Sequence, residues 1–362
     1  GRSRLPARTD TELLTALLAD EPGRDTVEAL LRVLPHVRGA YSLVVLDERR
    51  VIGVRDPHGY RPLVLGRLPA APAEPGLWDD PDAAAGWVLS SETVGLDVVG
   101  ADFVRDVEPG ELVILEPGVA PRSVRFAEAR PALCVFELIY FARPDSVMEG
   151  RNLYEVRRRM GMELAAEHAV AADLVMPVPD TGGPAAAGYA EASGIPYREG
   201  MYRNRYAGRT FIQPSQAMRH RGVTVKLNPL RDVVRDRRLV VVDDSIVRGT
   251  TTRAIVALLR RAGAAEVHVR ISAPPIPHPC FYGIDTQVET ELIAARHTVD
   301  EIRAFIGADT LGFLSIPGLL RALDVPAERF CFACFDGRYP EPVPYDAASR
   351  KFVLEEAPAP RG

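Results

Sequence analysis

The sequence predicts an α/β protein of two parts, in which a mostly antiparallel sheet with helices precedes a parallel sheet flanked by helices. The second part alternates strand-like apolar runs with helical patterns, and this alternation is typical of parallel sheets. The first part shows short apolar runs separated by polar or Gly/Pro breaks, which favours antiparallel pairing. The chain has 362 residues, 47% of them hydrophobic, which is enough for two domains with ordinary buried cores.

The first part begins with two helices. Four leucines at helical spacing follow Asp10, so we expect a helix with Thr9 or Asp10 as its N-cap. A second helix is expected at residues 25–34, and residues 47–50 indicate a hairpin turn. The predicted strands of this part are residues 39–46, 51–55, 63–65, 87–90 and 112–115.

Residues 117–131 separate the two parts, because this stretch is rich in Pro, Ala and Arg and has no sustained apolar period. We therefore divide the chain into domains at residues 1–128 and 129–362. In the second domain, helices are expected to begin at about Pro184 and Thr251. The predicted strands of this domain are residues 174–178, 239–242 and 267–271.

Charge and hydropathy exclude several classes of protein. The chain has 44 basic and 49 acidic residues, a net charge of −5, so no bulk charge favours nucleic acid or an anionic membrane surface. No apolar run approaches the roughly 18 residues of a membrane span, and the Arg-rich start has no hydrophobic region behind it. We expect a cytoplasmic protein with no nucleic-acid or membrane partner.

The cysteines lie at Cys134, Cys280, Cys331 and Cys334, a layout unlike the dense framework of a small disulfide-rich domain. The last two form a C-x-x-C motif, in which two thiolates can face one metal from a single turn. Spacing alone leaves zinc, an iron–sulfur cluster, a redox dithiol and plain buried thiols open.

The most informative stretch follows the predicted strand at residues 239–242. Asp243 and Asp244 come directly after it, and a hydroxyl-rich loop with one glycine leads into an amphipathic helix. Ligands bind at the carboxyl ends of strands in open α/β sheets, and the N–H groups at a helix start suit a phosphate. The two acids can accept hydrogen bonds from a sugar diol, directly or through a divalent ion. The alternative is that they cap the following turn, which is weakened by the cost of half-burying two charges without a partner.

A sugar phosphate is therefore the predicted ligand, and the stretch lacks the Gly-Lys-Ser/Thr ending of a Walker A loop. The residues of this stretch expected to bind the ligand are Asp243, Asp244, Ser245, Arg248, Gly249, Thr250 and Thr251.

Residues 241–252 resemble the phosphoribosylpyrophosphate (PRPP) signature of type I phosphoribosyltransferases. The Val-Pro-Asp-Thr-Gly string at residues 178–182, residues 204–214 and the C-x-x-C pair resemble, more specifically, the glutamine PRPP amidotransferases. The resemblance runs through nearly the whole chain. It implies a type I phosphoribosyltransferase domain with a C-terminal cluster-binding segment, preceded by a partial α+β N-terminal-nucleophile (Ntn) glutaminase domain.

The resemblance implies that Asp243 and Asp244 contact the ribose hydroxyls of PRPP and, with Thr181, lie near its Mg²⁺, an ion that prefers oxygen ligands. Asp180 belongs to a loop that would meet the pyrophosphate. Residues 203–229 resemble the family's flexible catalytic loop, which would close over PRPP and stabilise the leaving pyrophosphate. A solvated basic face is the alternative for this loop, and no general base is assigned. The basic residues singled out in it are Arg205, Arg209 and Lys226.

The four cysteines resemble the ligands of the 4Fe–4S cluster found in one branch of the family, each within its own motif. Thiolates are the usual ligands of such clusters. The resemblance therefore implies a structural 4Fe–4S cluster held by Cys134, Cys280, Cys331 and Cys334.

In the first part, Asp10 resembles the aspartate that holds the amino group of glutamine, although without the resemblance it is interpreted as a helix cap. His58 is interpreted as a packed or surface histidine. The family's N-terminal Cys nucleophile and oxyanion-hole Asn-Gly have no counterpart in the printed sequence, which opens on Gly1. We therefore expect no glutamine hydrolysis by the chain as given. Two interpretations stay open: a piece of a longer glutamine-dependent enzyme, or a natural short form that uses free ammonia or a separate glutaminase.

These expectations combine into an amidophosphoribosyltransferase, a pentosyltransferase of de novo purine biosynthesis. Its reaction converts PRPP and free or glutamine-derived ammonia into 5-phosphoribosylamine and pyrophosphate. The resemblance also implies a homo-oligomer with purine nucleotides as feedback inhibitors. The alternatives are a catalytically silent regulatory protein that binds PRPP or nucleotides, and a salvage phosphoribosyltransferase, for which no clear aromatic base-stacking hood is visible.

Overall fold

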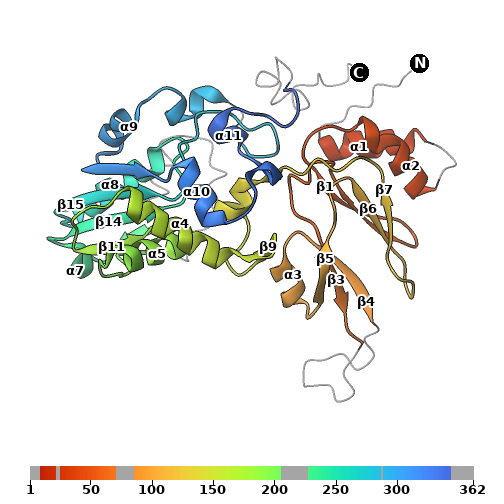
Figure 1. Ribbon diagram of the computed structural model, residues 1–362, viewed down its shortest axis with the longest axis horizontal. Coiled ribbons are helices and arrows are strands. Elements are labelled where there is room, and N and C mark those ends of the chain that lie inside the picture. Colours follow the sequence, from red (N-terminus) through yellow and green to blue (C-terminus); the bar gives the residue numbers. More distant parts are fainter. Residues whose placement is uncertain (1–8, 22–24, 71–84, 205–226, 287, 344–362) are drawn as a thin grey trace, which may run out of the picture.

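The computed structural model describes residues 9–21, 25–70, 85–204, 227–286 and 288–343, and Figure 1 shows two parts beside each other. Antiparallel sheets form the part that is red to yellow in the figure. A parallel sheet with helices forms the part that is green to blue. Within these ranges, no helix is both long and apolar enough to cross a bilayer.

The first part is built on two antiparallel sheets, with strand orders β1-β2-β6-β7 and β4-β3-β5. The hairpin predicted at residues 47–50 is confirmed, since it joins β1 to β2 with Leu46 paired to Val51. Helix α2 begins after Asp25, whose side chain accepts from the Val27 N–H, and buries an apolar face against the first sheet. The elements are α1 (Asp10–Ala19), α2 (Thr26–Val33), η1 (Leu34–His36), β1 (Ser42–Leu46), β2 (Val51–Arg55), β3 (Val64–Leu68), β4 (Gly86–Ser90), α3 (Thr93–Val98), β5 (Asp102–Asp106), β6 (Glu111–Leu115) and β7 (Arg122–Arg125).

Residues 117–131, where the sequence analysis places the domain boundary, contain a strand that was not predicted. This strand, β7, pairs antiparallel with β6. Three of the four residues of β7 are exposed, because it is an edge strand of its sheet, and so it carries no apolar period. Strand β5 also escaped prediction, since its residues are mostly exposed and charged.

The second part is organised around a parallel sheet in the order β11-β14-β15-β16. Strand β14 is almost entirely buried, which matches its continuous apolar run, because helices cover both faces of such sheets. The elements up to β14 are β8 (Leu133–Cys134), the π-helix η2 (Glu137–Phe141), β9 (Val147–Met148), β10 (Arg151–Asn152), α4 (Leu153–Glu167), β11 (Leu174–Pro177), α5 (Gly183–Ser193), β12 (Met201–Arg203), β13 (Leu227–Pro229), α7 (Arg231–Val234) and β14 (Arg238–Asp243). They are followed by α8 (Thr250–Arg261), β15 (Glu266–Ile271), η3 (Glu289–Glu291), η4 (Ile293–Ala295), α9 (Val299–Ile306), β16 (Thr310–Phe313), α10 (Ile316–Leu323), η5 (Ala327–Arg329), β17 (Phe330–Cys331) and α11 (Ala333–Asp336).

The chain leaves β11 and β14 in opposite directions. After β11, α5 leads to Tyr197, which bridges in parallel to Val175 on the edge of β11 that faces away from β14. After β14, α8 leads the other way, to β15. A crevice for ligands forms at the carboxyl ends of two strands where the connections diverge in this way. The fold therefore places a candidate site between the loops that follow β11 and β14.

Helices α4 and α5 cross at very short range beside this sheet. Gly161 of α4 lies directly against the Ala185 carbonyl, and Gly188 of α5 lies directly against the Arg158 carbonyl. A Cβ atom at either position would overlap the facing oxygen. The two glycines thus allow the backbones to touch, which fixes α4 against the sheet.

We expect Gly188→Ala to destabilise the protein, because overpacking against backbone cannot be relieved by a rotamer change. The free energy of unfolding should fall by about 1–3 kcal/mol, which thermal unfolding followed by circular dichroism would detect. Gly183→Ala in the same helix is the matched control, since its Cβ would meet no atom within 4 Å. Equal melting temperatures for the two variants would contradict the close crossing.

Candidate functional site

The centre of the site is a pair of buried carboxylates at the carboxyl end of β14. Asp243 and Asp244 are only 8% and 7% exposed. The Asp244 N–H donates to Asp243 Oδ1 over 3.0 Å, and Ser245 Oγ donates to Asp244 Oδ1 over 2.6 Å. No ion pair joins either acid to a basic side chain among the residues that the structure describes. Two neighbouring acids therefore share a buried position without a cationic partner in contact.

Burial raises the pKa of both carboxyls. For Asp243 the neighbouring charge of Asp244 adds to this effect. For Asp244 the hydrogen bonds from Ser245 and Thr181 and the charge of Arg157 act in the opposite direction. A ligand that brings hydroxyl donors or a cation would offset the cost of this buried negative charge.

The loop after β11 supplies the opposite wall of the crevice. Thr181 Oγ1 donates to Asp244 Oδ2, so the predicted Mg²⁺-site residues Thr181, Asp243 and Asp244 do come together. Gly182 allows this approach, because a Cβ there would lie 2.5 Å from the Val242 carbonyl oxygen. Asp180 faces outward and pairs with Arg203 of β12 at 2.7 Å.

The loop after β14 supplies a helix N-terminus. Gly249 has φ 72°, which is the left-handed region that favours glycine, and it is the N-cap of α8. The first N–H groups of α8, from Thr250 and Thr251, have no partner within the helix, so an anion can bind there. Arg248 forms an ion pair with Glu291 and is thus held at the rim of the loop.

A different loop, at residues 203–229, was predicted to close over PRPP. The basic residues singled out in it, Arg205, Arg209 and Lys226, lie outside the described residues.

A second arginine and a tyrosine near this site were missed by the sequence analysis. Arg157, in α4, is 3% exposed, and its positive charge interacts with Asp244. Tyr140, in the π-helix η2, is 41% exposed, and the charges of Asp244 and Asp243 act on its hydroxyl. Neither residue belongs to a recognisable motif, although the rarity of π-helices and their frequency at functional sites would single out η2 once the backbone is known.

The four cysteines gather at the junction of the two parts. Cys331 of β17 pairs in register with Cys134 of the parallel strand β8, and Cys334 follows one turn later in α11. All four thiols are buried, and none forms a disulfide. Cys280 accepts a 3.4 Å hydrogen bond from the Tyr282 N–H.

The thiols are close enough to raise one another's pKa values. Burial raises the pKa of Cys134 to about 12 and that of Cys331 to about 11, and the other cysteines add to the effect. The pKa of Cys334 is raised by burial and then by the three other thiols. No three His, Cys, Asp or Glu side chains in the described part converge as one metal ion would require. A 4Fe–4S cluster holds its thiolates farther apart than a single ion does, so four free buried thiols in mutual range fit such a cluster in number, kind and burial.

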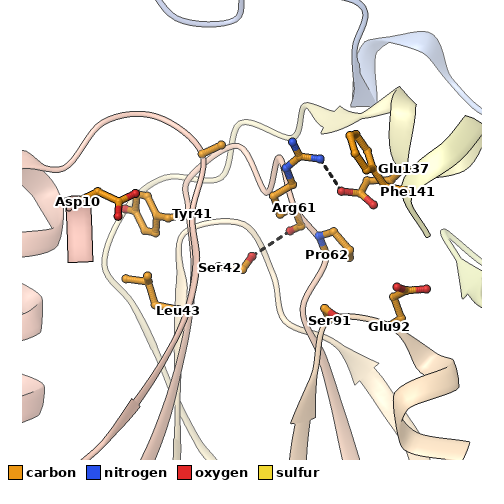
Figure 2. Close-up of a pocket in the computed structure, with 11 residues that line it drawn as sticks. Asp10, Tyr41, Ser42, Leu43, Arg61, Pro62, Ser91, Glu92, Glu137 and Phe141 are labelled. Atoms are coloured by element: carbon orange, nitrogen blue, oxygen red, sulfur yellow. Dashed lines mark hydrogen bonds and ion pairs between the residues drawn. The ribbon is translucent and has the colours of Figure 1, made fainter. Parts of the chain in front are cut away.

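A cavity of about 460 Å³ lies between the two parts. Figure 2 shows Asp10 and Tyr41 on one side of it and Glu137 and Phe141 on the other. Arg61 spans the junction, because it donates to Glu137 Oε1 over 2.6 Å and its guanidinium lies 5.0 Å from the centre of the Phe141 ring. The cavity therefore has one wall from the first part and one from η2.

Asp10 and His58 have different environments. Asp10 is the first residue of α1, while Thr9 is the N-cap and accepts from the Glu12 N–H. The Asp10 carboxylate is thus available to line the cavity, although it also accepts from the Thr11 N–H. His58 is 5% exposed, with Nδ1 2.8 Å from the Arg130 carbonyl.

Comparisons with known proteins bear on the whole chain. No protein-family model matches it. The curated amidophosphoribosyltransferase of Mycobacterium leprae is 51% identical over 361 residues, which cover 98% of this chain and 62% of that protein. The one of Synechocystis sp. is 52% identical over 355 residues, which cover 97% of this chain and 69% of the relative. The chain thus spans a little under two thirds of the length of the mycobacterial relatives.

The fold agrees with these relatives. A solved structure of the glutamine PRPP amidotransferase from B. subtilis, complexed with ADP and GMP, superimposes with a TM-score of 0.82 and 48% identity, covering 93% of this chain and 72% of that one. The parallel sheet is that of a type I phosphoribosyltransferase, and the antiparallel part is that of an Ntn glutaminase. With about half of all residues identical over almost its full length, the chain belongs to the amidophosphoribosyltransferase family.

Proposed function

We propose that the chain carries the transferase activity of its family: PRPP and ammonia give 5-phosphoribosylamine and pyrophosphate, the first step of de novo purine biosynthesis. The observation that carries this proposal is the buried pair Asp243 and Asp244 in a member of this family, with Asp244 accepting a hydrogen bond from Thr181 across the crevice. We propose the domain division at residues 1–128 and 129–362 as well. It is supported by the change of sheet type between the two parts.

Each part of PRPP matches a feature of the crevice. The ribose hydroxyls would donate to Asp243 and Asp244, which offer buried acceptors. The 5-phosphate would accept from the first N–H groups of α8, where Gly249 lets the backbone come close and Thr250 and Thr251 add hydroxyls. The pyrophosphate would face the loop at residues 180–183, with its N–H groups and Thr181. Ser245 stays engaged with Asp244 and holds that carboxylate in place.

Mg²⁺, bound with PRPP, would neutralise the charge that develops on the leaving pyrophosphate, and its oxygen ligands on the protein would be Asp243, Asp244 and Thr181. In the reaction, the ammonia lone pair forms the new C1–N bond while the C1–O bond to pyrophosphate breaks. A proton then leaves the nitrogen for solvent. Orientation and electrostatic stabilisation are the contributions of the protein, and we assign no side chain as a general base.

We propose that Cys134, Cys280, Cys331 and Cys334 hold a 4Fe–4S cluster with a structural role. The support is that all four thiols are buried, free and in mutual electrostatic range, with the positive charge of Arg61 beside Cys134. Purine nucleotides are proposed as inhibitors, because the B. subtilis relative is complexed with ADP and GMP. Three further expectations from the sequence stay predictions: that the chain forms a homo-oligomer, that it is cytoplasmic, and that Asp10 binds the amino group of glutamine.

The proposal is tested by release of pyrophosphate from PRPP and Mg²⁺ by anaerobically purified protein, with ammonium or glutamine as donor. We expect release with ammonium. Release with glutamine would contradict the expectation that the printed chain lacks glutaminase activity. PRPP binding without release under any condition would overturn the transferase proposal in favour of the silent regulatory protein.

We expect Asp243→Asn to reduce kcat/KM for PRPP about 100-fold or more, because the ribose and the cation lose a charged acceptor. Its melting temperature should be equal or higher at pH 7, since the substitution removes one of two adjacent buried like charges. Steady-state kinetics and thermal unfolding measure the two effects. Asp173→Asn is the control: Asp173 pairs with Arg238 at the opposite end of β14, so it should leave kcat/KM unchanged. A loss of both activity and stability in Asp243→Asn would contradict this assignment.

We expect Cys331→Ser to lose bound iron and sulfide and the visible absorption of the cluster, because a hydroxyl is a poor substitute for a thiolate. Iron content, expected at about four per chain in the parent protein, and absorption spectra under anaerobic conditions provide the measurement. Ala333→Ser lies within the same C-x-x-C turn, and Ala333 is also buried, so this variant controls for the added hydroxyl. Full iron content in Cys331→Ser would exclude this cysteine as a ligand.

A further inference from the structure

Tyr60 is a fully buried tyrosine of the first part of the chain, and it packs beside the cysteines. It forms a small buried core together with Tyr282, Cys280 and Cys331. Its exposed fraction is 0%. The Tyr60 carbonyl accepts from the Cys134 N–H over 3.0 Å, so its backbone is fixed beside a third cysteine. Tyr60 is therefore held next to residues that are proposed to bind the iron–sulfur cluster.

The ring of Tyr60 is held in a fixed plane by Tyr282. The two rings stack, with their centres 4.2 Å apart and their planes 13° apart. The Tyr282 hydroxyl donates to the Glu341 carbonyl over 3.0 Å and accepts from the Glu341 N–H over 3.2 Å. The Tyr282 N–H donates to Cys280 Sγ over 3.4 Å. The stack thus ties Tyr60 to the segment that carries Cys280, and it keeps the Tyr60 hydroxyl inside the protein.

The Tyr60 hydroxyl is buried without a hydrogen-bond partner among the residues that the structure describes. The Tyr282 hydroxyl beside it is already engaged by the Glu341 backbone. A buried hydroxyl without an acceptor costs about 1–3 kcal/mol, so such a group in a folded protein indicates an acceptor that binds there. A buried water would itself need two or more polar partners, and the core around Tyr60 offers mainly rings and thiols.

We propose that the Tyr60 hydroxyl donates a hydrogen bond to a sulfur atom of the 4Fe–4S cluster. The inference rests on the cluster proposed above, and it adds to that cluster a residue from the first part of the chain. Tyr60 is a positioning residue here and not a ligand. Cluster sulfurs carry negative charge, and hydrogen bonds to them are one of the factors that set the reduction potential.

The test compares the reduction potential of the cluster in the parent protein and in Tyr60→Phe, by protein-film voltammetry under anaerobic conditions. We expect a more negative potential in Tyr60→Phe, because the reduced cluster carries more negative charge and loses a donor. A tenfold change in the reduction equilibrium, about the factor of one hydrogen bond, corresponds to ~59 mV for one electron. Iron should stay at about four per chain, since the ring and its stack are kept.

Two other tyrosine variants are matched controls. Tyr282→Phe removes a hydroxyl from the same stack, but one whose partner is the Glu341 backbone, so the potential should not change. Tyr189→Phe removes a hydroxyl from another fully buried tyrosine, in α5, which donates to the His168 carbonyl over 2.9 Å. It should lower the melting temperature and leave the potential unchanged, which separates a loss of stability from the loss of a donor to the cluster.

An unchanged potential in Tyr60→Phe would overturn the proposal. Equal shifts in Tyr60→Phe and Tyr282→Phe would also overturn it, because the packing of the stack would then be the cause. If Tyr60→Phe folds but binds no iron, Tyr282→Phe decides: iron kept in Tyr282→Phe supports the donor, and iron lost from both variants contradicts it. Absence of iron in the parent protein is seen before any variant is compared, and it would overturn the cluster together with the inference that rests on it.

Discussion

The burial of two adjacent carboxylates at the end of β14 is the constraint on which the rest of the site depends. Asp243 and Asp244 repel each other and have lost most of their water. Such an arrangement persists only where the surrounding fold is stable enough to impose it and where a ligand later offsets the charge. Strand β14 is almost entirely buried and lies between β11 and β15, and this packing provides that stability.

Within the described part of the chain, the neighbouring groups supply hydrogen-bond donors to the acids but no cation in contact with them. Hydroxyls from Thr181 and Ser245 come from the two loops of the crevice, and the charge of Arg157 acts from a helix behind it. A fully paired acid cluster would be more stable but would have no capacity left for a sugar diol or a metal ion. The unpaired acids thus lower the stability of the fold but leave carboxylate oxygens free to bind a ligand, as is common at functional sites.

The junction between the two parts concentrates several roles on few residues. Arg61 pairs with Glu137 and lies over the Phe141 ring, and its positive charge interacts with the thiols of Cys134 and Cys280. The π-helix η2 follows β8 directly, so the backbone that carries Cys134 continues into the turn that carries Tyr140. Arg61 thus belongs both to the cavity lining and to the surroundings of the cysteines.

Local sequence pattern was sufficient to predict the site residues that follow strands. Asp243 and Asp244 stand at the end of an apolar run, whereas Thr181 is expected only from the family resemblance. Parallel strands bring their carboxyl ends to one edge of the sheet, so the proximity of the two loops follows from the fold class. Arg157 and Tyr140 could not be found in this way. Neither belongs to a motif singled out in the sequence, and their surroundings depend on which backbone carbonyls and charges face them from other parts of the chain.

The sequence by itself determined the fold class, the family, the strands and helices that carry a clear apolar pattern, and the acid pair with its loop, because these follow from short-range periodicity and contiguous motifs. Only the tertiary structure decided that β7 and β5 are strands, since exposed edge strands carry no apolar period. It also decided the meeting of Cys134 with Cys331 and the cavity between the two parts. Contacts of this kind join residues that are far apart in the chain, and their geometry is set by packing and not by local pattern.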